Sequence, residues 1–179
     1  MNSSPNGGWV GNITADEVCE VWDGQLQPVA ADLISTDVSP STRQFLTKVG
    51  LPTRYSELIT FHHDERLLRP VTMASVKYHT LADAASRPVA LKAHTDEVWA
   101  LDPTGRGGDR FVNTHPSFLV LFLGILLPLI DQLHDQEPYD FDARLDEVAA
   151  RFAAHDAAAL ADPDSWWSTV LEVTREGYI

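Results

Sequence analysis

The sequence predicts a single α+β domain in which a central, largely antiparallel sheet of about four to six strands is flanked by N-terminal and C-terminal helices. Helical patterns lie toward both ends of the chain, and short runs of β-branched and aromatic residues fill its middle. The connections between these runs are too short for parallel crossovers. The 179 residues suffice for one sizeable core and scarcely for two domains.

The N-terminal part predicts a tail followed by a short helix. Residues 1–12 are rich in Gly, Asn and Ser, so we expect a flexible tail before a domain over residues 13–179. Thr14 and Glu17 form a capping box, in which each side chain satisfies a free backbone donor of the first turn. Gly24 is expected to end this helix.

A second helix is bracketed on both sides. Ser39 is placed to cap it, and Pro40 occupies its first position, where the missing N–H costs nothing. The Gly-Leu-Pro run at residues 50–52 ends it.

The middle of the chain predicts a meander of short strands. Turn-forming stretches at residues 85–88 and 102–105 separate some of them. Connections of this length favour antiparallel neighbours. The runs expected to form strands are 58–61, 71–79, 89–94, 98–101 and 110–113.

A long apolar helix follows the strands. Asn113 or Thr114 is expected to cap it, Pro116 lies in its first turn, and Pro128 is expected to kink its later part. Its apolar run, residues 118–130, is shorter than the roughly 20 residues that a bilayer requires. We therefore interpret it as a buried core helix.

Two further helices complete the predicted fold. Asp140 or Asp142 opens an amphipathic helix, and residues 157–161 extend or follow it. A last helix begins near residues 162–164, and Gly177 closes it.

The chain is strongly acidic and its charge is uneven. Asp and Glu number 26 against 13 Lys and Arg, a formal net charge of -13. Residues 131–179 alone hold 12 acidic and 3 basic residues. Such a chain repels phosphate backbones and attracts basic partners. Cys19 is the single cysteine, which excludes an intramolecular disulfide and fits a reducing cytoplasm.

One cluster of side chains suggests metal chemistry. His62, His63 and Asp64 are consecutive, but neighbouring residues on a strand point to opposite faces. Metal-binding histidines on a helix usually lie four residues apart, and no HExxH pattern occurs. We therefore expect strand-end or surface histidines and no metal site.

Two other features resemble catalytic motifs only superficially. The glycine-rich residues 104–109 lack the spacing of a phosphate loop and lie between two strand-like runs, so they predict a hairpin connection. No GxSxG elbow occurs, and Cys19 is expected to act as a small buried hydrophobe.

Two adjacent aromatic residues near the C-terminus invite a second interpretation. On a helix, Trp166 and Trp167 diverge by about 100°, so one ring can enter the core while the other lies at its edge. Tryptophan is enriched at binding hot spots. Trp167 is therefore included in the candidate partner-binding surface.

Several residue groups carry a resemblance to a known family when they are taken in chain order. Phe-Leu at 45–46 and Gly-Leu-Pro at 50–52 precede the strand-rich middle. The strand at 98–101 and the Phe-Val-Asn-Thr step at 111–114 then lead into the apolar helix, and a Trp-Trp helix at 166–172 ends the domain. In this order the chain resembles the SUKH superfamily, in particular its fourth group of bacterial immunity proteins.

The resemblance implies an α+β fold with a largely antiparallel sheet. It also implies an immunity protein encoded beside a polymorphic toxin, often a nuclease or a nucleotide-modifying enzyme. The family shares no catalytic residues, so none can be transferred to this chain, and we expect neither a cofactor nor a metal.

Together, the charge and the resemblance predict a cytoplasmic, non-enzymatic protein that neutralises a basic toxin and binds neither nucleic acid directly nor a membrane. Two alternatives remain open: a regulatory or scaffold module for a non-toxin protein, and a small metal-dependent hydrolase. The residues expected to contact the partner are Asp135, Glu137, Asp140, Asp142, Asp146, Asp156 and Trp167.

Overall fold

The computed structural model describes residues 13–85, 87–135 and 140–177, without the side chains of residues 133–135. The predicted tail, residues 1–12, lies outside this part, so the domain boundary at residue 13 stays a prediction. The helices are α1 (Ala15–Trp22), α2 (Pro40–Lys48), α3 (Pro116–Asp135), α4 (Phe141–His155) and α5 (Trp166–Arg175), with short 3-10 helices η1 (Ala31–Leu33) and η2 (Ala157–Leu160).

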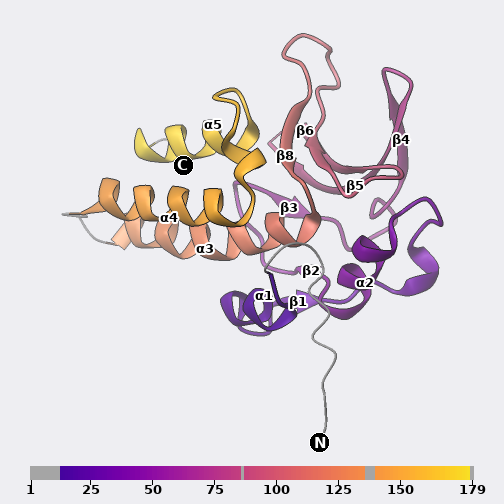
Figure 1. The fold of residues 1–179 in the computed structure, drawn as a ribbon, viewed down its shortest axis with the longest axis horizontal. Helices are drawn as coiled ribbons and strands as arrows, with labels where there is room; N and C mark the ends of the chain where they lie inside the picture. The colour runs from indigo at the N-terminus through magenta and orange to yellow at the C-terminus, as the bar shows by residue number, and fades with distance from the viewer. Residues whose placement is uncertain (1–12, 86, 136–139, 178–179) are drawn as a thin grey trace, which may run out of the picture.

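Six strands of the described chain form one antiparallel sheet in the order β3-β5-β6-β7-β8, and β4 pairs with the other half of β5. The helices α3, α4 and α5 stack to one side of it, while α1 and α2 lie below (Figure 1). The predicted α+β fold is therefore confirmed. The strands are β3 (Thr60–Phe61), β4 (Pro70–Met73), β5 (Val76–Ala84), β6 (Arg87–Lys92), β7 (Val98–Ala100) and β8 (Arg110–Asn113).

The strand predicted over residues 71–79 is two strands in the structure. Ala74 and Ser75 form a tight turn with φ of 46° and 67°, and β4 folds back on β5 with Met73 opposite Val76. Neither turn residue is Gly or Asn, the residues that favour positive φ, so the pattern carried no turn signal.

A second, two-stranded sheet escaped the sequence pattern. It joins β1 (Leu26–Gln27) to β2 (Leu51–Pro52) directly after α2. Gly50 makes this approach possible, because a Cβ on it would lie 2.0 Å from the Gln27 carbonyl oxygen, and its φ is 92°. The glycine expected to end α2 therefore also permits a close backbone contact.

The helix starts follow local chemistry. Thr14 Oγ1 accepts a hydrogen bond from Glu17 N at 3.2 Å, and Ser39 Oγ accepts one from Thr42 N at 3.1 Å, so both predicted caps are confirmed. The predicted return bond to the Glu17 carboxylate stays a prediction. The prediction that Asn113 or Thr114 caps α3 is wrong, because the helix begins at Pro116 and follows His115 directly. His115 Nδ1, two residues ahead of Ser117, accepts the hydrogen bond from Ser117 N at 3.1 Å.

Helix α3 passes through the core. Its residues from Pro116 to Leu123 are all buried, and Pro128 lies within its assigned range. Gly124 lets α1 approach: a Cβ there would lie 2.5 Å from Val21 Cγ2, and Trp22 Nε1 donates to the Val120 carbonyl at 2.8 Å. In the described part of the chain, no helix combines the length and apolarity needed to cross a bilayer.

Candidate functional site

Three of the carboxylates predicted to contact a partner are exposed at the start of α4. Asp142 and Asp146 lie one turn apart, and Asp140 precedes the helix. Arg175 on α5 meets two of them: its Nε lies 3.7 Å from Asp142 Oδ1, and its Nη2 donates to Asp146 Oδ1. This arginine offsets part of their charge, so they attract a basic partner less than free carboxylates would.

Asp156 is buried within the protein, contrary to its expected place at the surface. The residue is 5% exposed, and its Oδ2 accepts hydrogen bonds from Asn113 Nδ2 at 3.0 Å and from Thr114 N at 2.9 Å. It joins the end of α4 to the approach to α3, and this structural role replaces the expected surface role. The side chain of Asp135 is not described and Glu137 lies outside the described residues, so their contacts stay predictions.

Trp167 is also internal, and its expected place on the partner-binding surface is corrected. Its Nε1 donates to Asn113 Oδ1 at 2.9 Å. Its ring packs 4.9 Å from that of Phe152 and 5.5 Å from that of Phe122, centroid to centroid. The indole therefore finds both apolar cover and a polar partner within the core, and no part of it is exposed.

A different aromatic pair reaches the surface. A cavity of about 520 Å³ lies where the loop between β7 and β8 approaches the connection from η2 to α5. The rings of Trp99 and Phe111, both partly exposed, meet edge to face here with centroids 5.4 Å apart. We call this cavity the aromatic hollow; its lining residues are Trp99, Gly107, Asp109, Arg110, Phe111, Ala158, Asp162, Asp164 and Ser165.

Three exposed carboxylates line the aromatic hollow: Asp109, Asp162 and Asp164. The one cation among its lining residues is Arg110, whose Nη1 donates to Thr169 Oγ1 on α5 at 2.8 Å. Because the carboxylates outnumber the guanidinium, the hollow favours a positively charged occupant.

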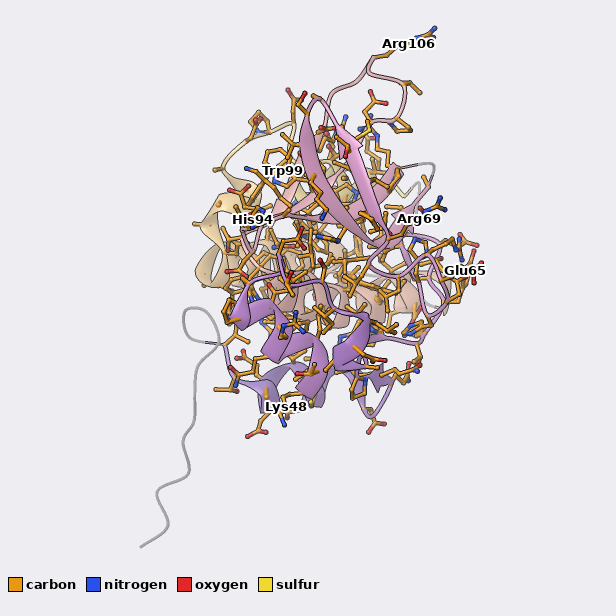
Figure 2. All side chains as sticks on the ribbon, turned by 90° about the vertical axis from the view of Figure 1, so that its right-hand side faces the viewer. Lys48, Glu65, Arg69, His94, Trp99 and Arg106 are labelled. Carbon is orange, nitrogen blue, oxygen red and sulfur yellow. The ribbon has the colours of Figure 1, made fainter. Side chains whose placement is uncertain are left out.

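The orientation of Trp99 is set by its own neighbours. Its Nε1 donates to Glu97 Oε2 at 3.1 Å, and Lys92 Nζ lies 2.8 Å from the same oxygen. The hydrogen bond from Lys92 lowers the pKa of Glu97, which keeps this acceptor ionised. Figure 2 shows Trp99 beside the strands, below a loop that carries Arg106 away from the body. The ring is thus held in place by contacts within the chain.

The glycine-rich loop that borders the hollow is the predicted hairpin connection between β7 and β8. Asp102 organises it by accepting hydrogen bonds from Thr104 N at 2.9 Å and from Gly107 N. The hydrogen bond from the Thr104 hydroxyl, together with these two backbone bonds, holds the pKa of Asp102 well below its usual range. Asp109 Oδ1 in turn accepts from Asp102 N at 2.7 Å. The loop is therefore ordered by its own carboxylates, which disfavours phosphate there.

The histidine cluster does not converge. His62 is buried, with Nε2 3.6 Å from Asp83 Oδ2, whereas His63 Nε2 bonds to a main-chain carbonyl 2.8 Å away. Asp64 accepts from Arg66 instead, and this bond lowers its pKa to about 2. Among the residues that the structure describes, no group of three or more His, Cys, Asp or Glu is placed to hold a metal ion.

Cys19 is exposed on α1, contrary to the expectation of a buried hydrophobe. Partial desolvation and the Asp16 carboxylate raise its pKa. A raised pKa disfavours the thiolate, which is the nucleophilic form. The helical pattern misplaced this residue because the apolar face of α1 runs through Val18 and Trp22.

The aromatic hollow was not identified from the sequence, although one signal for it exists. Val98 and Ala100 on β7 are fully buried, so strand alternation turns Trp99 toward the opposite face. A large ring on the face away from the core is a candidate contact residue. Its proximity to Asp162 and Asp164 depends on the tertiary fold.

The fold and this site define an α+β protein with helices beside an antiparallel sheet and an acidic, aromatic hollow at the surface. The SUKH-4 immunity protein family model matches residues 23–173. Because this match covers most of the chain, the protein belongs to the SUKH-4 immunity protein family, and an immunity function follows from that membership. Comparisons with curated proteins and with solved structures found no match.

Proposed function

We propose that this protein binds a cognate polymorphic toxin and neutralises it by covering the surface with which the toxin acts. The observation that carries the proposal is the match of residues 23–173 to an immunity protein family. The exposed carboxylates of α4 and the aromatic hollow supply side chains suited to recognition: charge for attraction and large rings for anchoring.

The partner is a basic toxin, such as a nuclease or an enzyme that modifies nucleic acid. Enzymes of that kind need basic clefts, and a protein with a net charge of -13 can occupy such a cleft as a phosphate backbone does. Asp140, Asp142 and Asp146 remain in the proposed contact surface because all three are exposed. Asp135 and Glu137 remain in it on sequence grounds.

Neutralisation proceeds in the cytoplasm, by binding alone and without a cofactor. His63 bonds to a main-chain carbonyl and Asp64 to Arg66, while His62 Nε2 approaches Asp83, so the three side chains do not share one ligand, which supports this mechanism over metal-dependent hydrolysis. The raised pKa of Cys19 also argues against thiol catalysis.

Co-expression tests the proposal. The toxin domain encoded beside this gene is expressed in a bacterial host with and without the chain, and growth is recorded. We expect growth only when both are present. With purified proteins, we expect a nanomolar Kd that weakens by about tenfold or more when the salt concentration rises from 50 to 200 mM, because charge drives the encounter.

The matched control is a non-cognate toxin domain of similar net charge. If the chain protects against it equally well, the effect reflects acidity alone and the specific immunity proposal is wrong. Absence of both binding and protection for the neighbouring toxin would also contradict the proposal, as would neutralisation that consumes a small molecule.

A further inference from the structure

The outer face of the sheet carries a second apolar cluster, separate from the main core. Tyr78, Ala90 and Leu101 are buried at its centre, and Trp99 packs against them while staying partly exposed. Ala90 alternates along β6 with Val89 and Leu91 of the main core, so the two clusters lie on opposite faces of the sheet. Partly buried residues at its margin, in addition to Trp99, are Val71, Met73 and Val76.

Trp99 joins this cluster to the aromatic hollow. It packs on the cluster, meets Phe111 edge to face, and lines the cavity itself. Trp99 therefore links the apolar residues of the β4–β5 hairpin to Phe111 in the hollow. Surfaces of this kind, with fixed aromatic rings beside charged groups, are typical of protein-binding hot spots.

The charges around the hollow select its occupant. Asp109, Asp162 and Asp164 are exposed, whereas Arg110 donates to Thr169 on α5. An arginine side chain suits both the carboxylates and the aromatic rings of the hollow, because its planar guanidinium pairs with carboxylates and stacks on aromatic rings. A similar contact exists within the chain, where Lys92 Nζ lies 5.9 Å from the centre of the Trp99 ring.

We propose that the aromatic hollow is the anchor point of the toxin, and that it receives an arginine-bearing segment of the toxin surface. This inference rests on the proposed function and locates the toxin-binding surface on the fold. The hollow lies at the N-terminal end of α5, and the α4 carboxylates meet Arg175 at its other end, about 15 Å away along the helix. The roughly 800 Å² that a partner covers in an ordinary interface is wide enough to span this separation.

The test uses two charge variants of the full chain that change the net charge equally. The first is Asp162→Asn with Asp164→Lys at the hollow, in which the asparagine keeps the acceptor for the Asp164 N–H. The second is Asp16→Asn with Glu20→Lys on α1, below the sheet in Figure 1 and outside the matched segment. Binding to the neighbouring toxin domain is measured by calorimetry, and folding by circular dichroism.

We expect the hollow variant to weaken Kd by about tenfold or more, and the α1 variant to change it by no more than about twofold. Trp99→Ala is expected to weaken Kd by a similar factor, and Trp99→Phe to recover part of the loss because it keeps an aromatic face. If Trp99→Phe binds the toxin domain more tightly than Trp99→Ala while the two variants have equal thermal stability, the ring contacts the toxin directly and the loss of binding is not caused by misfolding.

The outcomes are distinguishable. If the wild-type chain does not bind the toxin domain, the proposed function and this inference fall together. If it binds and the two charge variants weaken binding equally, or neither does, the inference alone is wrong. Sedimentation of the wild-type chain tests another occupant: a dimer that the hollow variant dissociates would overturn the inference in favour of self-association.

Discussion

Trp167 and Trp99 differ in their exposure: the first lies in the core and the second lies at the surface. Trp167 is fully buried, packs against Phe122 and Phe152, and donates its indole N–H to Asn113. Trp99 is partly exposed, meets one aromatic ring edge to face, and donates its indole N–H to Glu97. Each indole N–H has an acceptor, so hydrogen bonding does not distinguish the two residues. They differ in which elements pack over the ring.

The comparison teaches that residue type does not identify a contact residue. Trp167 is covered by rings from α3 and α4, whereas Trp99 lies on the outer face of the sheet. The buried region provides stability, and the exposed region is available for recognition. Measurements that separate stability from binding therefore test this division directly.

The largest expected effect is on the buried side. Trp167→Ala removes a fully buried ring and leaves the Asn113 amide oxygen without its donor, so we expect the free energy of unfolding to fall by about 3–5 kcal/mol. Urea denaturation at pH 7 measures it. A loss below about 1 kcal/mol would show that this cluster is not the stabilising region.

A pH series probes a second buried residue, His115, whose ring meets that of Phe45. Burial lowers the pKa of His115 to about 4 from its ordinary value of 6.5, although the Asp96 carboxylate opposes the shift. The folded state thus binds this proton less readily than the unfolded chain, so the contribution is complete above pH 6.5 and is lost as the pH falls toward 4. We expect wild type to lose more stability than His115→Gln between pH 7 and pH 4, measured by urea denaturation at each pH. Equal losses would contradict the shift.

A smaller loss of stability is expected at Asp156, which shares the partner Asn113 with Trp167. Asp156→Ala leaves two donors, Asn113 Nδ2 and Thr114 N, without their acceptor, so we expect a loss of about 2 kcal/mol. Asp142→Ala, on the exposed part of α4, is the matched control and should change stability by less than about 0.5 kcal/mol. Equal losses would place Asp156 at the surface after all.

A smaller loss of stability than at Asp156 is expected at the hollow. Trp99→Ala should cost about 1 kcal/mol, because the ring is partly exposed before it is removed. Thermal melting followed by circular dichroism measures it beside Trp167→Ala. If the two variants are equally destabilised, Trp99 is a core residue and the division between the regions does not hold.

Much of the fold follows from local patterns. The caps at Thr14 and Ser39, the apolar helix after residue 113 and the short strands between residues 58 and 113 depend on interactions between near neighbours in sequence. The hairpin turn at Ala74 and Ser75 did not follow, since pairing of β4 with β5 imposes a positive φ that these residues do not signal.

The candidate site followed much less. The acidity of the chain and the exposed Asp140, Asp142 and Asp146 agree with the pattern, but Asp156 and Trp167 are buried and Cys19 is exposed. Charge and size are properties of a residue, whereas exposure depends on what packs against it. The periodicity of a single helix does not show which of its residues a neighbouring helix covers.

The sequence by itself therefore determined the order of the elements, the antiparallel character of the sheet and the family, because these depend on short-range periodicity and on residue order. Tertiary structure alone decided which tryptophan reaches the surface and which carboxylates gather around it. The physical reason is sequence separation: the hollow brings Trp99 and Phe111 together with residues 158–165, and only packing of α5 and η2 against β8 makes them neighbours.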